Sequence, residues 1–450
     1  MSTVASERKF LVPTEELVRK ISSTKNEPEW MLEMRLRALQ LWQDTPMPHW
    51  GPDLSGLDLE NLTYFVDPNV KETDNWAELP KEIVDTFEKL GIPQAERDYL
   101  GGVGAQYESG IVYHRLKKEL ADKGVIFENM DVALQKYPEL VKEHFMTKCV
   151  PMTDHKFTML HAAVWSGGTF IYIPKGVKVA MPLQAYFRMN KERSAQFEHT
   201  LIIADEGSDI TYIEGCSAPQ YQFSSLHAGC VELWVKNDAH IKYISVENWS
   251  KNTYNLNTKK ALVMDRGHVE WVNGNLGSRV TMLYPSSVLL GRGARSESLG
   301  IVMAGKGQVQ DTGSKAVHIG KDTSSVIRSK SVSLDGGVSN YRGQVKILPS
   351  ATGATSVVQC DALLLDEGSV SNTYPSVKNE NGESEVSHEA SVGKIGDDEL
   401  FFMATRGYTA EDATRLIVAG FMDPIIKALP LEYALELNKL IELEMTDSIG

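Results

Sequence analysis

The chain has 450 residues, of which 42% are apolar and 24% charged, and it carries a net charge of −14. This composition is typical of a globular protein with a large core, and the acidic charge argues against nucleic acid or an anionic membrane as a partner. Four scattered cysteines and no long apolar segment lead us to expect a cytoplasmic protein with no disulfide framework, signal peptide or membrane span.

Residues 1–148 are expected to form a helical domain. Helices are predicted to begin at Pro28, at Pro80 and near Arg115, because apolar residues recur three or four positions apart after each of these points. A fourth helix is predicted over residues 131–145. The simplest interpretation of this region is a helical cap on the rest of the chain.

The pattern changes over residues 149–396, where short β-branched or aromatic runs alternate with turn residues. A repeat of about 15 residues favours a β-solenoid, in which each coil buries its apolar face against the next. A β-sandwich, with strands about every 8–12 residues, is the competing architecture. The repeat is clearest in turn glycines spaced 14 to 17 residues apart, at Gly320, Gly336, Gly353, Gly368 and Gly382.

Residues 397–450 are expected to be helical again. Thr409 is a predicted N-cap, Ala413 and Leu416 lie on one side of the helix that follows, and Pro430 begins another. Helices at both ends would cap an open solenoid.

Sequence motifs of the common enzyme classes are absent. The chain has no P-loop, no G-x-S-x-G, no H-E-x-x-H and no C-x-x-C. The stretch Gly101–Ala105 lacks the spacing of a dinucleotide-binding loop and is interpreted as a turn. We therefore expect no nucleotide hydrolysis by a P-loop, and we assign no lone Ser, His or Asp to catalysis.

The cysteines are the main candidates for chemistry, because thiolates bind soft metals and iron–sulfur clusters. Cys360 lies in a predicted strand, and His388 and Glu389 follow one turn and one strand later, so neighbouring coils offer sulfur, nitrogen and oxygen ligands. Alternatively, Cys360 is a small buried apolar residue and His388 a hydrogen-bonded core histidine. Cys216 adjoins a predicted turn, where a thiol is more often accessible and reactive; the alternative, an ordinary structural cysteine with no reactive role, stays open. No specific role follows for the other two cysteines, Cys149 and Cys230.

At these residues the sequence closely resembles the SufB family, the scaffold subunits of the Suf machinery for iron–sulfur cluster assembly. The resemblance runs along almost the whole chain and implies a right-handed parallel β-helix between helical terminal domains. The motifs that carry it include Gly102-Val-Gly-Ala-Gln-Tyr, Ser166-Gly-Gly-Thr-Phe-Ile-Tyr-Ile-Pro, Met181-Pro-Leu-Gln-Ala-Tyr, Glu214-Gly-Cys-Ser-Ala-Pro, Gln359-Cys-Asp and Ser387-His-Glu-Ala.

The resemblance implies a non-catalytic scaffold that accepts persulfide sulfur and iron, builds a nascent cluster and passes it to acceptor proteins. Its implied partners are the SufC ATPase, either a SufD subunit or a second SufB copy, and a cysteine desulfurase with its sulfur-transfer protein. The implied cofactor is a transient iron–sulfur cluster, whose type the resemblance does not specify. Reduced flavin is a further candidate. SufC would bind the C-terminal helices, at about residues 408–445.

Matched position by position, Cys216 would accept sulfur, and Cys360, His388 and Glu389 would form the cluster site, with Cys360 and Glu389 as metal ligands. The chain departs from the family in three places: Ser387 replaces a glutamate, Glu247 replaces a glutamine, and no cysteine-rich cluster precedes Cys149. The resemblance also implies a polar passage for sulfur, lined by Arg188, Asn190, Glu247, Trp249 and Lys259.

Two other functions are compatible with parts of the pattern. A SufD-like structural subunit would lack its own cluster ligand, and the presence of both Cys216 and Cys360 in their motifs favours the SufB type. A β-helical enzyme acting on carbohydrates would use paired carboxylates. The turns show no aromatic-rich groove to support that third reading.

Overall fold

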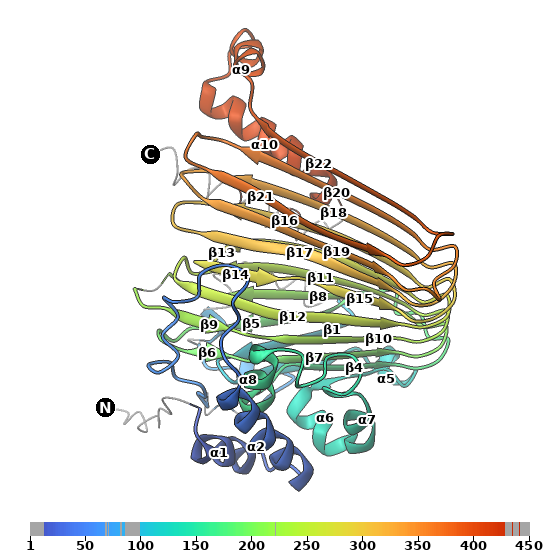
Figure 1. Cartoon of the computed structure of the whole chain (residues 1–450). Coiled ribbons are helices and arrows are strands. Elements are labelled where there is room, and N and C mark those ends of the chain that lie inside the picture. Colours follow the sequence, from blue (N-terminus) through green and yellow to red (C-terminus); the bar gives the residue numbers. More distant parts are fainter. Residues whose placement is uncertain are drawn as a thin grey trace.

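The computed structural model describes residues 13–67, 70, 72–81, 83–85, 100–220, 222–427, 434 and 441. Its centre is a tall solenoid made of two long sheets that face each other (Figure 1). Helices lie at the N-terminal end of the stack and beyond its last coil. The predicted β-helix with helical ends is therefore confirmed, and the sandwich alternative is wrong.

The first sheet has ten strands and the second has twelve. The 10-stranded sheet contains β1 (Gly102–Tyr107), β2 (Gly110–Leu116), β5 (Leu183–Arg188), β8 (Asp209–Ser217), β11 (His240–Trp249), β13 (His268–Gly277), β16 (Arg295–Ala304), β18 (Ser324–Ser333), β20 (Thr355–Leu364) and β22 (Glu385–Lys394). The 12-stranded sheet contains β3 (Ile126–Asn129), β4 (Thr169–Ile173), β6 (Ala195–Gln196), β7 (His199–Ala204), β9 (Ser225–His227), β10 (Cys230–Val235), β12 (Thr253–Val263), β14 (Val280–Leu283), β15 (Ser286–Leu289), β17 (Val309–His318), β19 (Val338–Ile347) and β21 (Val370–Asn379).

Strands of successive coils pair in parallel, and only β1–β2 and β3–β4 are antiparallel among the described strand pairs. Paired residues lie about 30 positions apart in sequence, as in the pairs His240–His268 and Ser324–Thr355. One coil therefore contains two strands and two turns, and the 15-residue repeat in the sequence is half a coil. At the turn after β18, Asp335 and Gly336 adopt φ values of 54° and 77°, the left-handed region that glycine occupies without strain.

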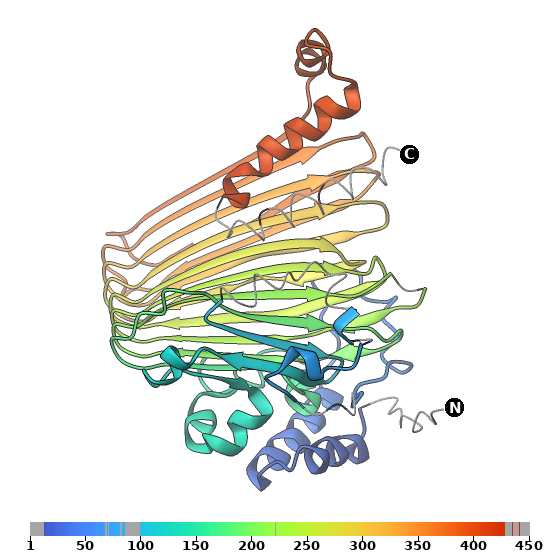
Figure 2. The same ribbon diagram turned by 180° about the vertical axis from the view of Figure 1, so that it is seen from behind.

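Apolar residues fill both the inside of the solenoid and its two outer faces. Inside, β5, β8, β11 and β13 contribute one core at the N-terminal end, and Ile327, Tyr341, Val358 and Cys360 belong to a second core near the last coil. Outside, the N-terminal helices pack on the 12-stranded sheet. The outer face of the 10-stranded sheet is covered by Leu79 and Ile83 of the segment before β1 and by the C-terminal helix α10 (Ala410–Ile426), which lies across it in Figure 2.

The N-terminal region differs from the prediction in several places. The first helix, α1, was not predicted, and Pro28 is the N-cap of α2 instead of its first residue. Arg115 belongs to β2, and the glycine-rich stretch interpreted as a turn is strand β1. Only part of the helix predicted at Pro80 falls within the described residues. The described helices are α1 (Glu15–Thr24), α2 (Glu29–Asp44), the short 3-10 helix η1 (Trp76–Glu78), α5 (Lys118–Ala121), α6 (Met130–Lys136), α7 (Pro138–His144) and α8 (Lys156–Val164).

The helix predicted over residues 131–145 is two helices, α6 and α7, because Pro138 opens a new helix after Tyr137. At the C-terminal end, Thr409 caps α10 as predicted, since its hydroxyl oxygen accepts a hydrogen bond from the backbone N–H of Asp412 at 3.1 Å. An additional helix, α9 (Asp397–Ala404), precedes it. The helix predicted at Pro430 lies outside the described residues. No described helix has the length and apolar content needed to cross a membrane.

Candidate functional site

Cys216 lies inside the solenoid, in strand β8. Strand register places it beside Phe187 of β5 and Glu247 of β11, and its side chain is 2% exposed. The prediction of an accessible thiol next to a turn is therefore wrong. Burial raises the pKa of the Cys216 thiol well above its usual value, and the carboxylates of Glu214 and Glu247 raise it further.

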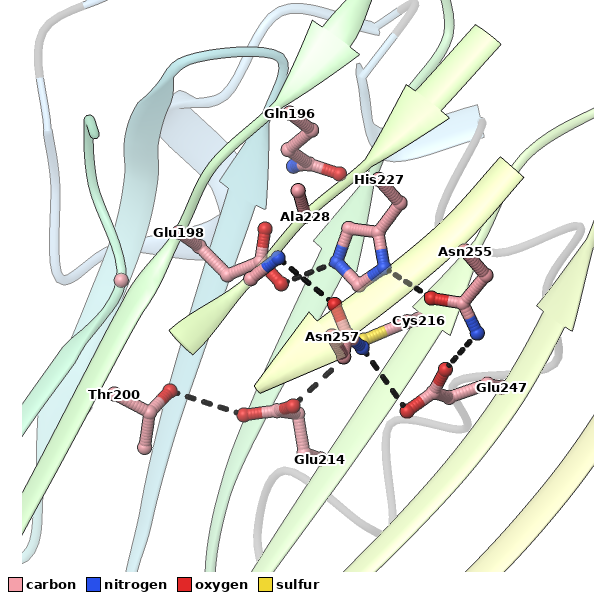
Figure 3. Close-up of polar contacts among 12 residues, drawn as sticks. Gln196, Glu198, Thr200, Glu214, Cys216, His227, Ala228, Glu247, Asn255 and Asn257 are labelled. Carbon is pink, nitrogen blue, oxygen red and sulfur yellow. Dashed lines mark hydrogen bonds and ion pairs between the residues drawn. The ribbon is translucent and has the colours of Figure 1, made fainter. Parts of the chain in front are cut away.

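Carboxylates surround this thiol (Figure 3). Glu214 Oε2 accepts a hydrogen bond from Thr200 Oγ1 at 3.0 Å, and its Oε1 accepts one from the Tyr243 hydroxyl at 2.6 Å. On the opposite strands, Glu198 Oε1 pairs with His227 Nε2. The ligand atoms of Glu198, Cys216 and His227 all lie within 4.8 Å of one another.

The charge of His227 follows from its two partners. Its Nδ1 lies 2.8 Å from Asn255 Oδ1, and its Nε2 contacts the Glu198 carboxylate, so both ring nitrogens have acceptors. Burial lowers the pKa of His227, but the Glu198 carboxylate outweighs this effect and the net pKa is raised. The second oxygen of Glu198, Oε2, is buried and has no hydrogen-bond partner among the described residues. Such an oxygen can accept a proton or a hydrogen bond.

An ion pair links this network to the next coil. Lys259 Nζ lies 2.8 Å from both Glu247 Oε1 and Ser245 Oγ, and 3.5 Å from Asn273 Oδ1. Both partners of the pair are fully buried. Burial raises the pKa of Glu247, but the Lys259 ammonium reverses that effect and the net pKa is lowered; Glu247 and Glu214 correspondingly raise that of Lys259. Both groups are therefore charged inside the solenoid.

The residues predicted to line a sulfur passage divide into two groups. Glu247, Trp249 and Lys259 are brought together with Cys216, and Trp249 Nε1 donates to Glu247 Oε2 at 3.3 Å. Arg188 follows Phe187 on β5 and so lies on the opposite face of the strand, where its Nη1 is 3.1 Å from Ser217 Oγ. Asn190 follows β5, and its amide donates to the Tyr107 hydroxyl at 2.8 Å. These last two residues lie beside the network instead of within it.

Cys360 lies at the far end of the solenoid, on the strand before the last one of its sheet. Its Sγ is 3.8 Å from His388 Nε2 on β22, so the structure brings this predicted pair together. Glu389 is in register with Gln359, which places its side chain on the opposite face of the sheet from Cys360. Only the backbone oxygen of Glu389 contacts the thiol, at 3.7 Å. Burial raises the pKa of Cys360.

A small cavity of about 20 Å³ lies inside the solenoid between the two thiols. Asn273, which contacts Lys259, lines one side, and Tyr341, which belongs to the same core as Cys360, lines the other. Asn275 Oδ1 and the Tyr341 hydroxyl are buried and lack a hydrogen-bond partner among the described residues. Polar groups therefore lie along part of the interior between Cys216 and Cys360, next to apolar residues such as Val302 and Ile327.

Sequence reasoning missed most of the groups around Cys216. Their signal was polar residues at every second position of a strand, which places them on one face. Two such series are Tyr243, Ser245 and Glu247 on β11, and Asn255, Asn257 and Lys259 on β12. The missed residues are Glu198, Thr200, Glu214, His227, Tyr243, Asn255 and Asn273.

Comparisons with known proteins agree with this architecture. A family model described as the SUF system FeS cluster assembly, SufBD core domain, matches residues 187–421, and a model of the SufBD protein N-terminal region matches residues 106–185. Iron-sulfur cluster assembly SufBD family proteins of Staphylococcus saprophyticus and Staphylococcus aureus strain MRSA252 are each 53% identical to the chain over 437 residues. Those alignments cover 97% of this chain and 94% of each relative.

Proposed function

The chain belongs to the SufBD family of iron–sulfur cluster assembly proteins, and we propose that it is the SufB-type scaffold on which a nascent cluster is built. The observation that supports this role is the placement of two thiols in one solenoid. Cys216 lies in a charged interior network, Cys360 lies beside His388 near the last coil, and polar groups lie along part of the interior between them.

In the proposed first step, Cys216 accepts sulfur from a persulfide carried by a cysteine desulfurase or its transfer protein. Cys216 first gives its proton to the neighbouring Glu214 carboxylate, whose Oε1 lies 3.9 Å from the Cys216 sulfur. The thiolate then attacks the outer sulfur, the donor S–S bond breaks, and the donor leaves as a thiolate. Cys216 then holds the persulfide. Lys259 is the cation that favours an anion on Cys216, against the opposing effect of the carboxylates of Glu214, Glu247 and Glu198.

In the proposed second step, sulfur moves through the partly polar interior to Cys360, where the cluster is assembled as cargo. Reduction of the transferred sulfur to sulfide consumes two electrons, and we propose reduced flavin as the external reductant. Cys360 and His388 offer one sulfur and one nitrogen ligand. Because the Glu389 carboxylate belongs to the opposite face, its proposed role as a ligand requires a change in the last strand.

The last coil supplies a surface for a second β-helical subunit, either SufD or another copy of the chain. Strands β21 and β22 end their sheets among the described residues. Their exposed apolar side chains include Tyr374, Val377 and Val392. A partner pairing there would cover the coil next to Cys360 and complete the cluster's ligands.

Anaerobic reconstitution of the purified chain with ferrous iron and sulfide tests the scaffold role. A SufB-type scaffold should develop the visible absorption of an iron–sulfur cluster, with matching iron and sulfide content. A SufD-like subunit has no cluster ligand of its own and should return colourless from the same treatment. A colourless product from folded protein, both alone and with its partner subunits, would exclude the scaffold role.

The C-terminal helices are the proposed docking site of the SufC ATPase. They expose Phe401, Phe402 and Leu416, which are 72%, 54% and 47% accessible, whereas Val418 and Met422 of α10 are buried against the 10-stranded sheet. An apolar, solvent-exposed face on a helix that is anchored by its other side is a typical protein contact.

Removal of all residues after Tyr408 is expected to abolish SufC binding in a pull-down. Because truncation also uncovers the sheet under α10, Leu416→Glu provides a milder variant that alters only the exposed face. It should reduce recovery of SufC about tenfold or more, since a charge in an apolar contact remains unpaired. Undiminished recovery of SufC by both variants would place the contact elsewhere.

A further inference from the structure

Three fully buried residues meet on the outer face of the 12-stranded sheet, beneath the N-terminal helices. His161 comes from α8, His199 from β7 and Cys230 from β10, and none is more than 1% exposed. Their ligand atoms all lie within 4.8 Å of one another. His199 follows Glu198 in the chain, so the pleat directs its ring away from the interior network around Cys216. The cluster is therefore separate from the site described above.

The hydrogen bond of His161 fixes its tautomer. Its Nδ1 lies 2.9 Å from the carbonyl oxygen of Ala228. Because a carbonyl oxygen only accepts, Nδ1 carries the proton and Nε2 presents a lone pair. That lone pair faces His199 Nδ1 at 3.0 Å. A neutral imidazole carries a single ring proton, so only one of its two nitrogens can donate.

The other nitrogen of His199 faces a carboxyl group. Its Nε2 is 3.2 Å from Glu232 Oε1, and the two oxygens of Glu232 accept backbone N–H bonds from Met146 at 2.5 Å and Val150 at 2.9 Å. The contact between His199 and Glu232 is a close approach and not a hydrogen bond, because His199 Nε2 has no hydrogen-bond partner among the described residues. When the ring proton of His199 is on Nε2, its Nδ1 presents a second lone pair to His161. Two lone pairs at this distance require a positive charge between them.

This arrangement matches the surroundings of metal-bound histidines. Such rings donate their outer N–H to a carboxylate or a backbone carbonyl, which orients the inner nitrogen toward the metal. Here the Ala228 carbonyl is that acceptor for His161, and the Glu232 carboxyl lies 3.2 Å from the outer nitrogen of His199. Without a metal, a proton fills the gap, since His199 Nδ1–H donates to the His161 Nε2 lone pair.

We propose that His161, His199 and Cys230 bind one Zn²⁺ ion. Two imidazole nitrogens and one thiolate are the donors that zinc prefers. Tetrahedral zinc with ordinary Zn–N bonds separates two ligand nitrogens by about 3.3 Å, close to the 3.0 Å between His161 and His199. The ion would tie α8 to β7 and β10 and so fasten the N-terminal helices to the solenoid.

Cobalt is the probe for this site, because Co²⁺ replaces Zn²⁺ and is coloured. The full chain would be produced in medium containing Co²⁺, since the site is closed, and purified without added iron or sulfide. One cobalt per chain is expected, with sulfur-to-cobalt charge transfer and the strong visible bands of a tetrahedral site. Cys230→Ser should lose the charge-transfer band, and Glu232→Gln should lower the cobalt affinity roughly 10- to 100-fold.

Three matched controls keep the result specific. Cys149 is also fully buried and belongs to the same core as Cys230, so Cys149→Ser should retain the band, as should Cys216→Ser. Cys360→Ser should retain it too, which separates this site from cluster assembly: either proposal can fail while the other holds. Absence of bound cobalt from the parent chain, or a band that depends on Cys149, Cys216 or Cys360, would overturn the assignment.

Should Cys230→Ser fail to fold, zinc-edge X-ray absorption of the parent chain gives the answer directly. Two nitrogen neighbours, one sulfur neighbour and a fourth light-atom neighbour, such as a water oxygen, are expected. A first shell without sulfur, or with several sulfurs, would contradict the proposed ligand set.

Discussion

Cys360→Ser is expected to reduce cluster formation to background while the solenoid remains folded. The substitution removes the thiolate that we propose as the main cluster ligand from this chain, and a serine hydroxyl is a poor ligand for iron in such a cluster. The structural cost is small, because serine has nearly the same shape and Cys360 lies close to the exposed last coil. Anaerobic reconstitution, read by visible absorption and iron content, measures the effect.

Cys149→Ser is the matched control for this experiment. Cys149 is buried under the N-terminal helices, far along the chain from the last coil, so its replacement should leave cluster content unchanged. Circular dichroism of both variants confirms that they are folded. Equal cluster content in Cys360→Ser and the parent chain would remove Cys360 from the site.

Lys259→Met is expected to lower the free energy of unfolding by about 3–5 kcal/mol, the usual cost of leaving one partner of a buried ion pair alone. Glu247 would lose its cation in a fully buried position, near Glu214, which already has a raised pKa. Urea denaturation at neutral pH, followed by circular dichroism, measures the change. Sulfur transfer to Cys216 should fail in the same variant, because the charge that stabilises its anion is gone.

The double variant Lys259→Met with Glu247→Gln separates the two effects. Removing both charges avoids the uncompensated carboxylate, so much of the lost stability should return. Sulfur transfer should remain impaired, since the cation is still missing. A loss below about 1 kcal/mol in the single variant would mean that Glu247 is protonated and that the ion pair does not form.

The sequence predicted the solenoid because turn residues recur at each half coil. The spacing of these turns stays regular regardless of which residues the strands contain. The direction of individual side chains was harder to predict. On β8, Tyr212 points inward and Ile213 outward, yet both are buried, because other elements cover the outer face. When both faces of a strand are buried, the alternation of polar and apolar residues disappears. This is why Cys216 was assigned to an accessible position.

Near the last coil, a difference of one position along a strand decides which predicted side chains meet Cys360. Cys360 and His388 were expected to meet, and they do, because they lie 28 positions apart and on the same face. Glu389 was expected to join them, but the next residue of a strand points to the opposite side. Strand β1 was missed because of its glycines. Gly102 is needed there, since a Cβ atom would lie 2.7 Å from the ring of Phe127.

The final coil has a consequence for the chain in isolation. A parallel sheet edge carries backbone donors and acceptors that another strand can satisfy, and β21 and β22 form two such edges side by side. Two chains that meet through this end form a closed pair, because each buries the end that the other needs covered. If a second β-helical subunit covers this end, as proposed above, an excess of this chain over that subunit favours self-association, and co-expression of the two prevents it.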